Sequence, residues 1–211
     1  MKQHHVPVRA AWQSGFSLVE VAVVLVVIGV ILGAVLQGRS LVESAEYKSF
    51  RQSLRDYRSA FLNFRDRYDA LPGDFAEAAA RIEGGLDDGD GDGVIEGGTE
   101  CDSTGEEACT AWQHLRAAGM LKGDPGPTGP DAAPEHGYGG VVSGYFTGTG
   151  AHSEFGNHLL VEDVPVEIAR RLDREEDDAR CDNGRITGQT CDPSDSEDWP
   201  ASGPVNVVYA L

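Results

Sequence analysis

The chain has 211 residues, and its 35 Asp and Glu against 17 Lys and Arg give a formal net charge of −18. The acids are concentrated in residues 70–211, which carry 29 of them but only eight Lys and Arg. Binding to nucleic-acid phosphates requires a locally positive surface, so we expect no nucleic-acid partner for this acidic part of the chain.

A polar leader precedes a long apolar run at the N-terminus. The leader, residues 1–15, carries Lys2 and Arg9 but no acid, and the apolar run occupies residues 16–36. As a helix rising about 1.5 Å per residue, a run of this length crosses a hydrocarbon core of about 30 Å. Positive charge before the run, and none within it, predicts a cytoplasmic N-terminus and an exported C-terminal part.

Glu20 is the one charged residue of the apolar run. A charged side chain within a membrane helix costs about 2.5 to 3.5 kcal/mol on insertion scales, so an acid in this place is first interpreted as functional. The alternative is a protonated carboxyl group that merely faces a neighbouring helix.

The sequence Gly-Phe-Ser-Leu-Val-Glu at positions 15–20 resembles the cleavage and methylation signal of type IV prepilins and type II secretion pseudopilins. The resemblance implies that a membrane aspartyl prepilin peptidase cuts between Gly15 and Phe16 and methylates the new amino group of Phe16. It also implies that Glu20 pairs with the Phe16 amino group of a neighbouring subunit during assembly. A plain signal anchor that is never cut is the alternative.

A stripe of apolar and aromatic residues continues beyond the apolar run with alternating gaps of three and four positions. Its members are Tyr47, Phe50, Leu54, Tyr57, Phe61, Phe64 and Tyr68. This spacing predicts a single helix over residues 16–68, whose second half packs against a globular domain as in pilin-like proteins.

A basic stripe runs beside the aromatic one. It consists of Lys48, Arg51, Arg55, Arg58 and Arg65. Two interpretations remain open: the stripe meets the acidic heads of neighbouring subunits, or it is a solvated face near anionic lipid headgroups.

The helix is expected to end at Leu71-Pro72-Gly73-Asp74, because Pro cannot continue a helix and Gly-Asp favours a turn. The following residues 82–115 contain ten acids and no Lys or Arg. Within them, Asp-Gly-Asp-Gly-Asp-Gly at 88–93 matches the front half of an EF-hand-type calcium loop.

The calcium-loop pattern predicts a structural Ca²⁺ site, with Ile95 packed away from the ion. The expected ligands are Asp88, Asp90, Asp92, the carbonyl group of Val94, and Glu96. Thr99 stands where an EF-hand has its bidentate Glu. A solvated acidic loop without an ion is the alternative.

The four cysteines have no CxxC spacing and fit an oxidising compartment outside the cytoplasm. Cys101 and Cys109 are eight positions apart, and Cys181 and Cys191 are ten apart. Of the three possible pairings, we favour the one with two short-loop disulfides, Cys101–Cys109 and Cys181–Cys191.

The remaining sequence predicts mixed structure. Helices are expected at 110–121 and 165–173, the second with Asp163 as its cap, and antiparallel strands at 141–147, 158–162 and 205–210. His136, His152 and His158 lie in Gly-rich loops and are expected to be solvated.

The predicted fold class is α+β, a long N-terminal helix packed on a small antiparallel-sheet head. The expected segments are a leader at 1–15, a transmembrane and assembly helix at 16–36, its amphipathic continuation at 37–69, and an acidic head at 70–211.

No nucleophile elbow, phosphate loop, HExxH pair or dinucleotide fingerprint occurs in the sequence, so we expect no enzyme. The resemblance implies a minor pilin or pseudopilin of a type IV pilus-like or type II secretion filament in the bacterial inner membrane. Its partners would be prepilin peptidase and other pilin subunits, with the head in the periplasm or on an extracellular filament. The alternative is a signal-anchored extracytoplasmic calcium-binding surface protein or hydrolase that forms no filament.

Overall fold

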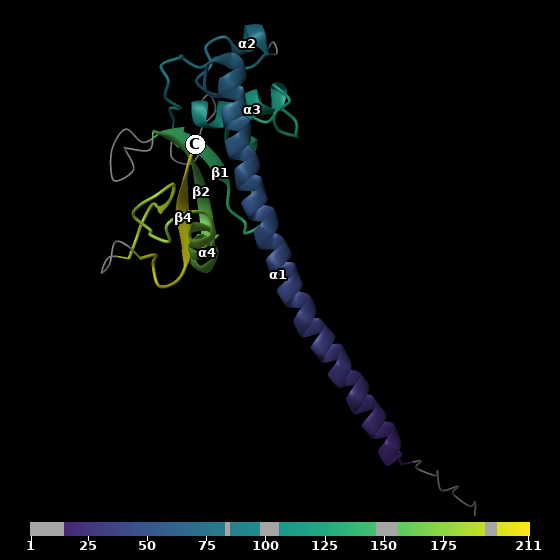
Figure 1. Cartoon of the computed structure of the whole chain (residues 1–211). Coiled ribbons are helices and arrows are strands. Elements are labelled where there is room, and N and C mark those ends of the chain that lie inside the picture. Colours follow the sequence, from purple (N-terminus) through teal and green to yellow (C-terminus); the bar gives the residue numbers. More distant parts are fainter. Residues whose placement is uncertain (1–14, 83–84, 98–105, 147–155, 193–197) are drawn as a thin grey trace, which may run out of the picture. The chain divides into compact units, whose positions relative to one another are not determined.

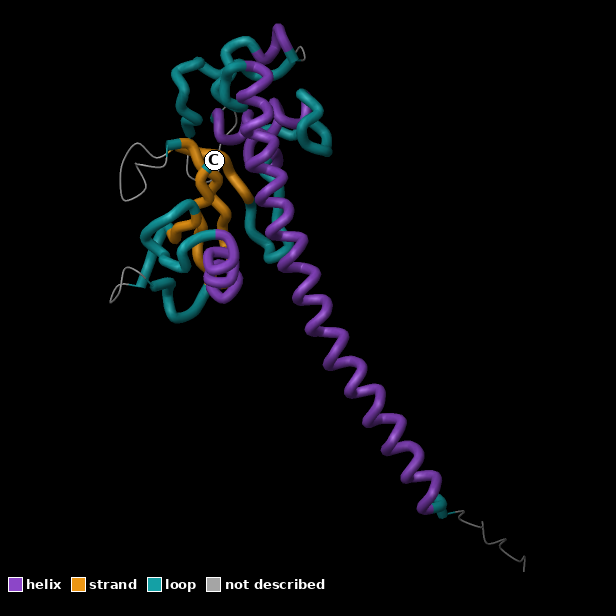
Figure 2. The backbone as a smooth tube through the Cα atoms, viewed as in Figure 1, coloured by secondary structure: helices purple, strands orange, loops and turns teal. Residues whose placement is uncertain are grey.

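The computed structural model describes residues 15–82, 85–97, 106–146, 156–192 and 198–211 (Figure 1). Helices, strands and loops are distinguished by colour in Figure 2. The elements in chain order are α1 (Leu18–Tyr68), α2 (Ala78–Arg81), α3 (Glu107–Ala117), the 3-10 turn η1 (Gly129–Ala132), β1 (Val142–Phe146), β2 (Asn157–Pro165), α4 (Val166–Glu176), β3 (Ile186–Gly188) and β4 (Pro204–Ala210).

Contacts divide the chain into two units, Met1–Ala45 and Glu46–Leu211, and α1 contributes to both. The helix contains 51 residues, and its bounds agree with the prediction to within two residues. In the first unit the large apolar side chains from Leu18 to Val42 are all at least 46% exposed. Among the described residues, α1 is the one helix long and apolar enough to cross a membrane.

The aromatic stripe of α1 forms the core of the second unit. Its residues Tyr47, Phe50, Leu54, Phe61 and Phe64 are buried, while Tyr57 and Tyr68 are partly buried and pack against this core. The rings of Tyr57 and Phe61 meet the indole of Trp112 on α3 edge to face, with centroid distances of 5.3 and 5.5 Å. The predicted packing of the stripe against a globular domain is therefore confirmed.

The second unit contains a four-stranded antiparallel sheet in the order β1-β2-β4-β3, beside the C-terminal half of α1 (Figure 1). On the inner strand β2, Leu159 pairs with Gly144 of β1 and with Tyr209 of β4. A Cβ atom at Gly144 would lie 2.9 Å from the ring of Phe61. Glycine therefore lets the sheet approach α1, and the architecture is the predicted α+β class.

Helix α4 begins at Val166, directly after β2. The prediction that Asp163 caps this helix is wrong, because the N-cap position is Pro165 and no side chain caps it. Asp163 instead lies within β2 with a φ of 52°, where the pairing with β4 shifts register between Val161 and Val164. It is an irregular residue of the strand rather than a helix cap.

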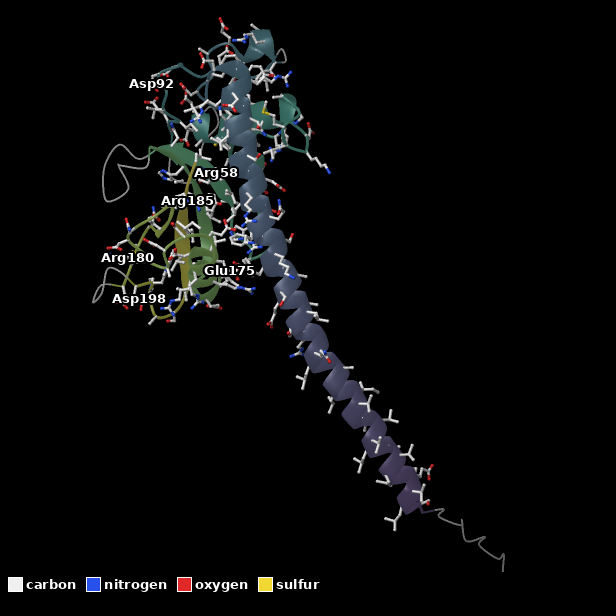
Figure 3. The ribbon with its side chains drawn as sticks, in the orientation of Figure 1. Arg58, Asp92, Glu175, Arg180, Arg185 and Asp198 are labelled. Carbon is white, nitrogen blue, oxygen red and sulfur yellow. A yellow bond between two sulfur atoms is a disulfide. The ribbon has the colours of Figure 1, made fainter. Side chains whose placement is uncertain are left out.

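Three residues of the basic stripe, Arg51, Arg55 and Arg58, contact the chain's own α4 and β4. Arg58 and Glu175 are labelled in Figure 3. Arg51 Nη1 lies 2.6 Å from Glu175 Oε2, and Arg55 Nη2 lies 2.9 Å from Glu176 Oε1. The Nε atom of Arg58 donates to the Ala210 carbonyl group at 3.1 Å. Neither interpretation of this stripe from the sequence included these contacts within one chain.

Candidate functional site

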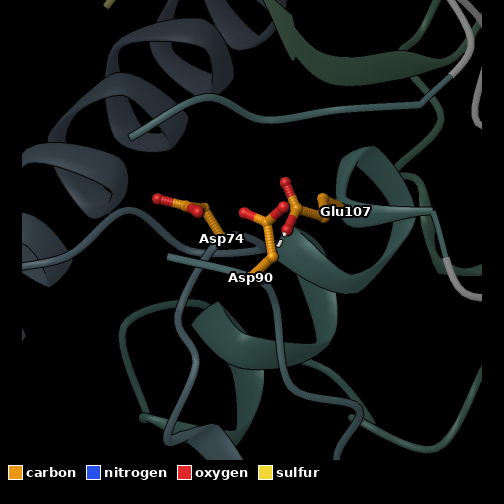
Figure 4. Close-up of side chains that lie close together, drawn as sticks. All are labelled: Asp74, Asp90 and Glu107. Carbon is orange, nitrogen blue, oxygen red and sulfur yellow. Dashed lines mark hydrogen bonds between the residues drawn. The ribbon is translucent and has the colours of Figure 1, made fainter. Parts of the chain in front are cut away.

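Three carboxylate side chains from separate segments meet in the second unit. Asp74 follows α1, Asp90 belongs to the acidic loop of residues 87–96, and Glu107 is the first residue of α3. Each offers one oxygen, and these oxygens all lie within 4.8 Å of one another (Figure 4). We call these three residues the Asp74 cluster. Of the calcium ligands predicted from the sequence, Asp90 alone belongs to it.

Close approach of glycines brings the segments of the Asp74 cluster together. A Cβ atom at Gly73 would collide with the carbonyl group of Glu107, and one at Gly89 would collide with the backbone of Gly73 and Asp74. The Gly89 N–H also donates to the Phe75 carbonyl group at 3.1 Å. The two glycines therefore allow backbone contact where a side chain would separate the acids.

The other predicted calcium ligands lie outside the Asp74 cluster. Asp88 Oδ1 accepts the Ala79 N–H at 2.9 Å, and Asp92 Oδ1 accepts the Val94 N–H at 2.8 Å. The Glu96 N–H donates to Glu107 Oε2 at 3.0 Å. Ile95 is buried, as the pattern predicted. Thr99 lies outside the described residues.

The carboxyl group of Asp74 is the most deeply buried member of its cluster, with 2% of the residue exposed. Burial raises the pKa of Asp74, against the lowering effect of the backbone N–H groups of Gly93, Gly91 and Asp92, of which the Gly93 N–H donates to Oδ2 at 3.0 Å. The other oxygen, Oδ1, is buried and has no hydrogen-bond partner among the described residues. Burial also raises the pKa of Glu107, against the effect of the N–H groups of Glu96 and Asp90 that donate to it.

A buried histidine ties the acidic loop to the turn after α1. His114 Nδ1 accepts the Gly73 N–H at 3.0 Å, so the neutral ring carries its proton on Nε2 and donates it to the Asp87 carbonyl oxygen at 2.8 Å. Burial lowers the pKa of His114. No spacing in the sequence pointed to this role, because both partners of the ring are backbone groups.

The expectation of solvated imidazoles was wrong for two of the three loop histidines. His136 and His158 are buried, and His136 Nε2 lies 2.7 Å from the Glu162 carbonyl oxygen. His152 lies outside the described residues.

A second group of three acids, Asp173, Asp177 and Asp178, lies at the C-terminal end of α4 and beyond it. We call it the Asp173 cluster. Its buried member has a donor for each oxygen: Ala179 N–H donates to Asp173 Oδ1 at 3.1 Å, and Trp199 Nε1 donates to Oδ2 at 2.8 Å. Burial raises the pKa of Asp173 to about 6.

The predicted disulfide between Cys181 and Cys191 is present, with a Cα–Cα distance of 5.7 Å. Cys109 is also disulfide-bonded. Cys101 lies outside the described residues.

The three residues predicted for cleavage, methylation and assembly lie at the start of α1. Gly15 and Phe16 precede the helix, and the Phe16 side chain is 81% exposed. Glu20 lies in the first turn of α1 and is exposed. A carboxylate there complements the positive end of the helix dipole, and the bond between Gly15 and Phe16 lies outside regular structure.

Residues 13–36 match the family model of the prokaryotic N-terminal methylation motif. The chain carries a prepilin-type signal. No curated protein and no solved structure matches the chain.

The prepilin-type signal supports a type IV pilin-like or pseudopilin substrate of prepilin peptidase. It also implies assembly with other pilin subunits. Together with the apolar first half of α1, the signal fits a membrane-anchored protein.

Proposed function

We propose that the protein is a structural subunit, a minor pilin or pseudopilin, of a type IV pilus-like or type II secretion filament. The observation that carries this proposal is the exposed apolar surface of α1 from Leu18 to Val42, most of which lies within the prepilin-type signal. Exposed apolar surface of this extent is unfavourable in water and is buried either in lipid or against other helices. Assembly through the first unit therefore uses a surface that the described part of the chain leaves uncovered.

Glu20 gives the assembly its direction. An ionised carboxylate surrounded by apolar helices is costly unless a cation pairs with it. Cleavage after Gly15 would create a positive amino group at Phe16, four positions from Glu20 in the sequence. A Glu20 carboxylate that pairs with the Phe16 amino group of a neighbouring subunit would then favour one axial register of the helices.

The disulfide of the second unit supports its export. The bond between Cys181 and Cys191 favours an oxidising environment, which supports export of the second unit across the inner membrane. The N-terminus would face the cytoplasm, where prepilin peptidase meets the leader. The low content of basic residues in the head supports a subunit without a nucleic-acid ligand.

Mass spectrometry of the native protein, extracted from membranes, tests the processing step. We expect a chain that begins at N-methylated Phe16. A chain that retains residues 1–15, or is cut elsewhere, would contradict the proposal and favour an anchored surface protein or hydrolase that forms no filament.

The matched variants Glu20→Leu and Glu43→Leu test assembly. Both side chains are exposed on α1, but Glu20 alone lies within the apolar run. Sheared filaments should contain Glu43→Leu at the level of the native protein and should lack Glu20→Leu, although all three chains insert and are cut. Normal incorporation of Glu20→Leu would contradict the proposed pairing of Glu20 with the Phe16 amino group.

A further inference from the structure

We propose that Asp74, Asp90 and Glu107 together bind one divalent cation, and that this cation is Ca²⁺. This ligand set differs from the consecutive loop ligands of an EF-hand, since it joins the turn after α1, the acidic loop and the start of α3. The cation would hold the three segments together. The proposal does not depend on filament assembly, because all three ligands lie in Glu46–Leu211.

The unpartnered oxygen of Asp74 carries the argument. Asp74 is 2% exposed, and its Oδ1 atom has no hydrogen-bond partner among the described residues. A buried polar atom without a partner is rare in folded proteins and costly, especially on a charged group. Asp74 supplies one of the three converging oxygens, so a cation bound to this carboxylate would provide the missing partner.

No cationic side chain of the described residues neutralises the carboxylates of the Asp74 cluster. No described ion pair involves Asp74, Asp90 or Glu107, and residues 82–115 contain no Lys or Arg. Backbone N–H groups of Gly93, Asp90 and Glu96 donate to Asp74 and Glu107, which lowers the cost of ionisation without neutralising the charges. Three adjacent carboxylates therefore favour either a bound cation or a retained proton.

The spacing and chemistry of the oxygens favour Ca²⁺. Two oxygens bound to one Ca²⁺ at about 2.3 to 2.6 Å lie at most about 5 Å apart. The three oxygens of the Asp74 cluster lie within 4.8 Å of one another. A site made of oxygen ligands suits hard cations, and Ca²⁺ accepts irregular geometry, whereas Mg²⁺ requires a near-ideal octahedron. Asp90 is exposed, so water can complete the coordination.

Calorimetry tests the proposal on the full chain in detergent, after a chelator has removed bound metal from the protein. We expect CaCl₂ to bind with a stoichiometry of one and with higher affinity than MgCl₂. At a calcium concentration about 100-fold above the Kd, the Tm should rise by about 5 °C or more. Absence of calcium heat in the native chain would overturn the proposal, and equal affinity for Mg²⁺ would contradict the choice of calcium.

Four substitutions locate the site. Asp74→Asn and Glu107→Gln should abolish the calcium heat and the shift in Tm. Asp88→Asn, in the same loop but outside the cluster, and Asp178→Asn, in the other acidic group, should retain both. Loss of binding in Asp88→Asn with retention in Glu107→Gln would instead place the ion in the loop alone and overturn the ligand set.

Stability without calcium separates lost binding from lost folding. Asp74→Asn removes one of three repelling charges, so its Tm in chelator should equal or exceed that of the chelated native chain. If Asp74→Asn and Glu107→Gln both kept the native calcium affinity, calcium would bind outside the Asp74 cluster and the proposed ligand set would be overturned.

Discussion

The Asp74 cluster and the Asp173 cluster both bring three acidic side chains together around one buried carboxylate, but they satisfy that carboxylate differently. Both oxygens of Asp173 accept N–H groups, from Ala179 and from the indole of Trp199. One oxygen of Asp74 accepts the Gly93 N–H, and the other has no partner among the described residues. The number of acids in a cluster is therefore a poor guide to a cation site, and the donors around the buried member are a better one.

The Asp173 cluster is completed by the chain that follows α4. Ala179 has a φ of 67°, an uncommon conformation for a residue with a side chain, and its N–H is thereby part of the turn that donates to Asp173. Asp177 Oδ2 accepts the N–H groups of Arg185 and Ile186, which carries the turn into β3. These acids fix a turn, and we expect them to need no ion.

The largest effect is expected from closing the space that lets the Asp74 cluster form. Gly89→Ala should lower the free energy of unfolding by about 3 kcal/mol, because its Cβ atom would collide with the backbone of Gly73 and Asp74. Gly137→Ala is the matched control, since a Cβ atom there meets nothing within 4 Å. It should change stability by about 0.5 kcal/mol or less.

Urea unfolding of both variants, followed by the fluorescence of the tryptophans, of which Trp112 and Trp199 are buried, measures this difference. Gly89→Ala should also lose the calcium-dependent rise in Tm, because the loop can no longer hold Asp90 beside Asp74. Equal stability of the two variants would mean that the acidic loop contributes little to folding of the head.

The long-range part of the Asp74 cluster could not be predicted from spacing. The sequence pointed to Asp90 because an EF-hand pattern is local, with ligands at alternate positions of one loop. Asp74 and Glu107 are 33 positions apart, and their approach depends on two glycine contacts that no periodicity records. The aromatic stripe of α1 was predictable because helical spacing alone decides which side chains share a face.

The burial of the histidines could not be predicted from the sequence either. Gly-rich surroundings suggested solvent for His136, yet its ring packs edge to face against Phe50 at 5.3 Å and lies 2.7 Å from the Glu162 carbonyl oxygen. Glycines near it serve close approach: a Cβ atom at Gly140 would lie 2.7 Å from His136 Nε2. Composition indicated a loop, and only the tertiary contacts show what the loop covers.

An effect of intermediate size is expected from the pH dependence of the Asp173 cluster. The pKa of Asp173 is about 6 in the folded chain against a usual value of 3.8. The folded state therefore binds this proton more tightly than the unfolded state. Stability from this group is fully present below pH 3.8 and is lost as the pH rises through 6, so it should add about 1 kcal/mol between pH 7 and pH 5.

Asp173→Asn removes the contribution of Asp173 to the pH dependence of stability. The contribution of His114 changes with pH in the opposite direction. Because burial lowers the pKa of His114, its contribution is present above pH 6.5 and is lost as the pH falls below that value. Unfolding curves at pH 7 and pH 5 should therefore show the variant losing more stability on acidification than the native chain, while Asp178→Asn follows the native profile. Parallel profiles of Asp173→Asn and the native chain would contradict the raised pKa.

The smallest effect is expected at the ion pairs between α1 and α4, next to the Asp173 cluster. Arg55→Gln should cost about 0.5 kcal/mol, because the Arg55 side chain is 48% exposed and exposed ion pairs contribute little. Glu176 would also keep two other partners, Arg51 Nε at 3.6 Å and the Tyr209 hydroxyl group at 3.2 Å. The loss should shrink further in about 0.5 M salt, where exposed charges are screened.

Lys48→Gln is the control for Arg55→Gln, since Lys48 is exposed and has no ion pair within the described part of the chain. A cost above about 2 kcal/mol for Arg55→Gln would show that Glu176 behaves as a buried charge that has lost its partner. A small cost would show that the acids of α4 have redundant partners within the chain. That redundancy is what Asp74 lacks among the described residues, and it is the reason to look for a cation at Asp74 rather than at α4.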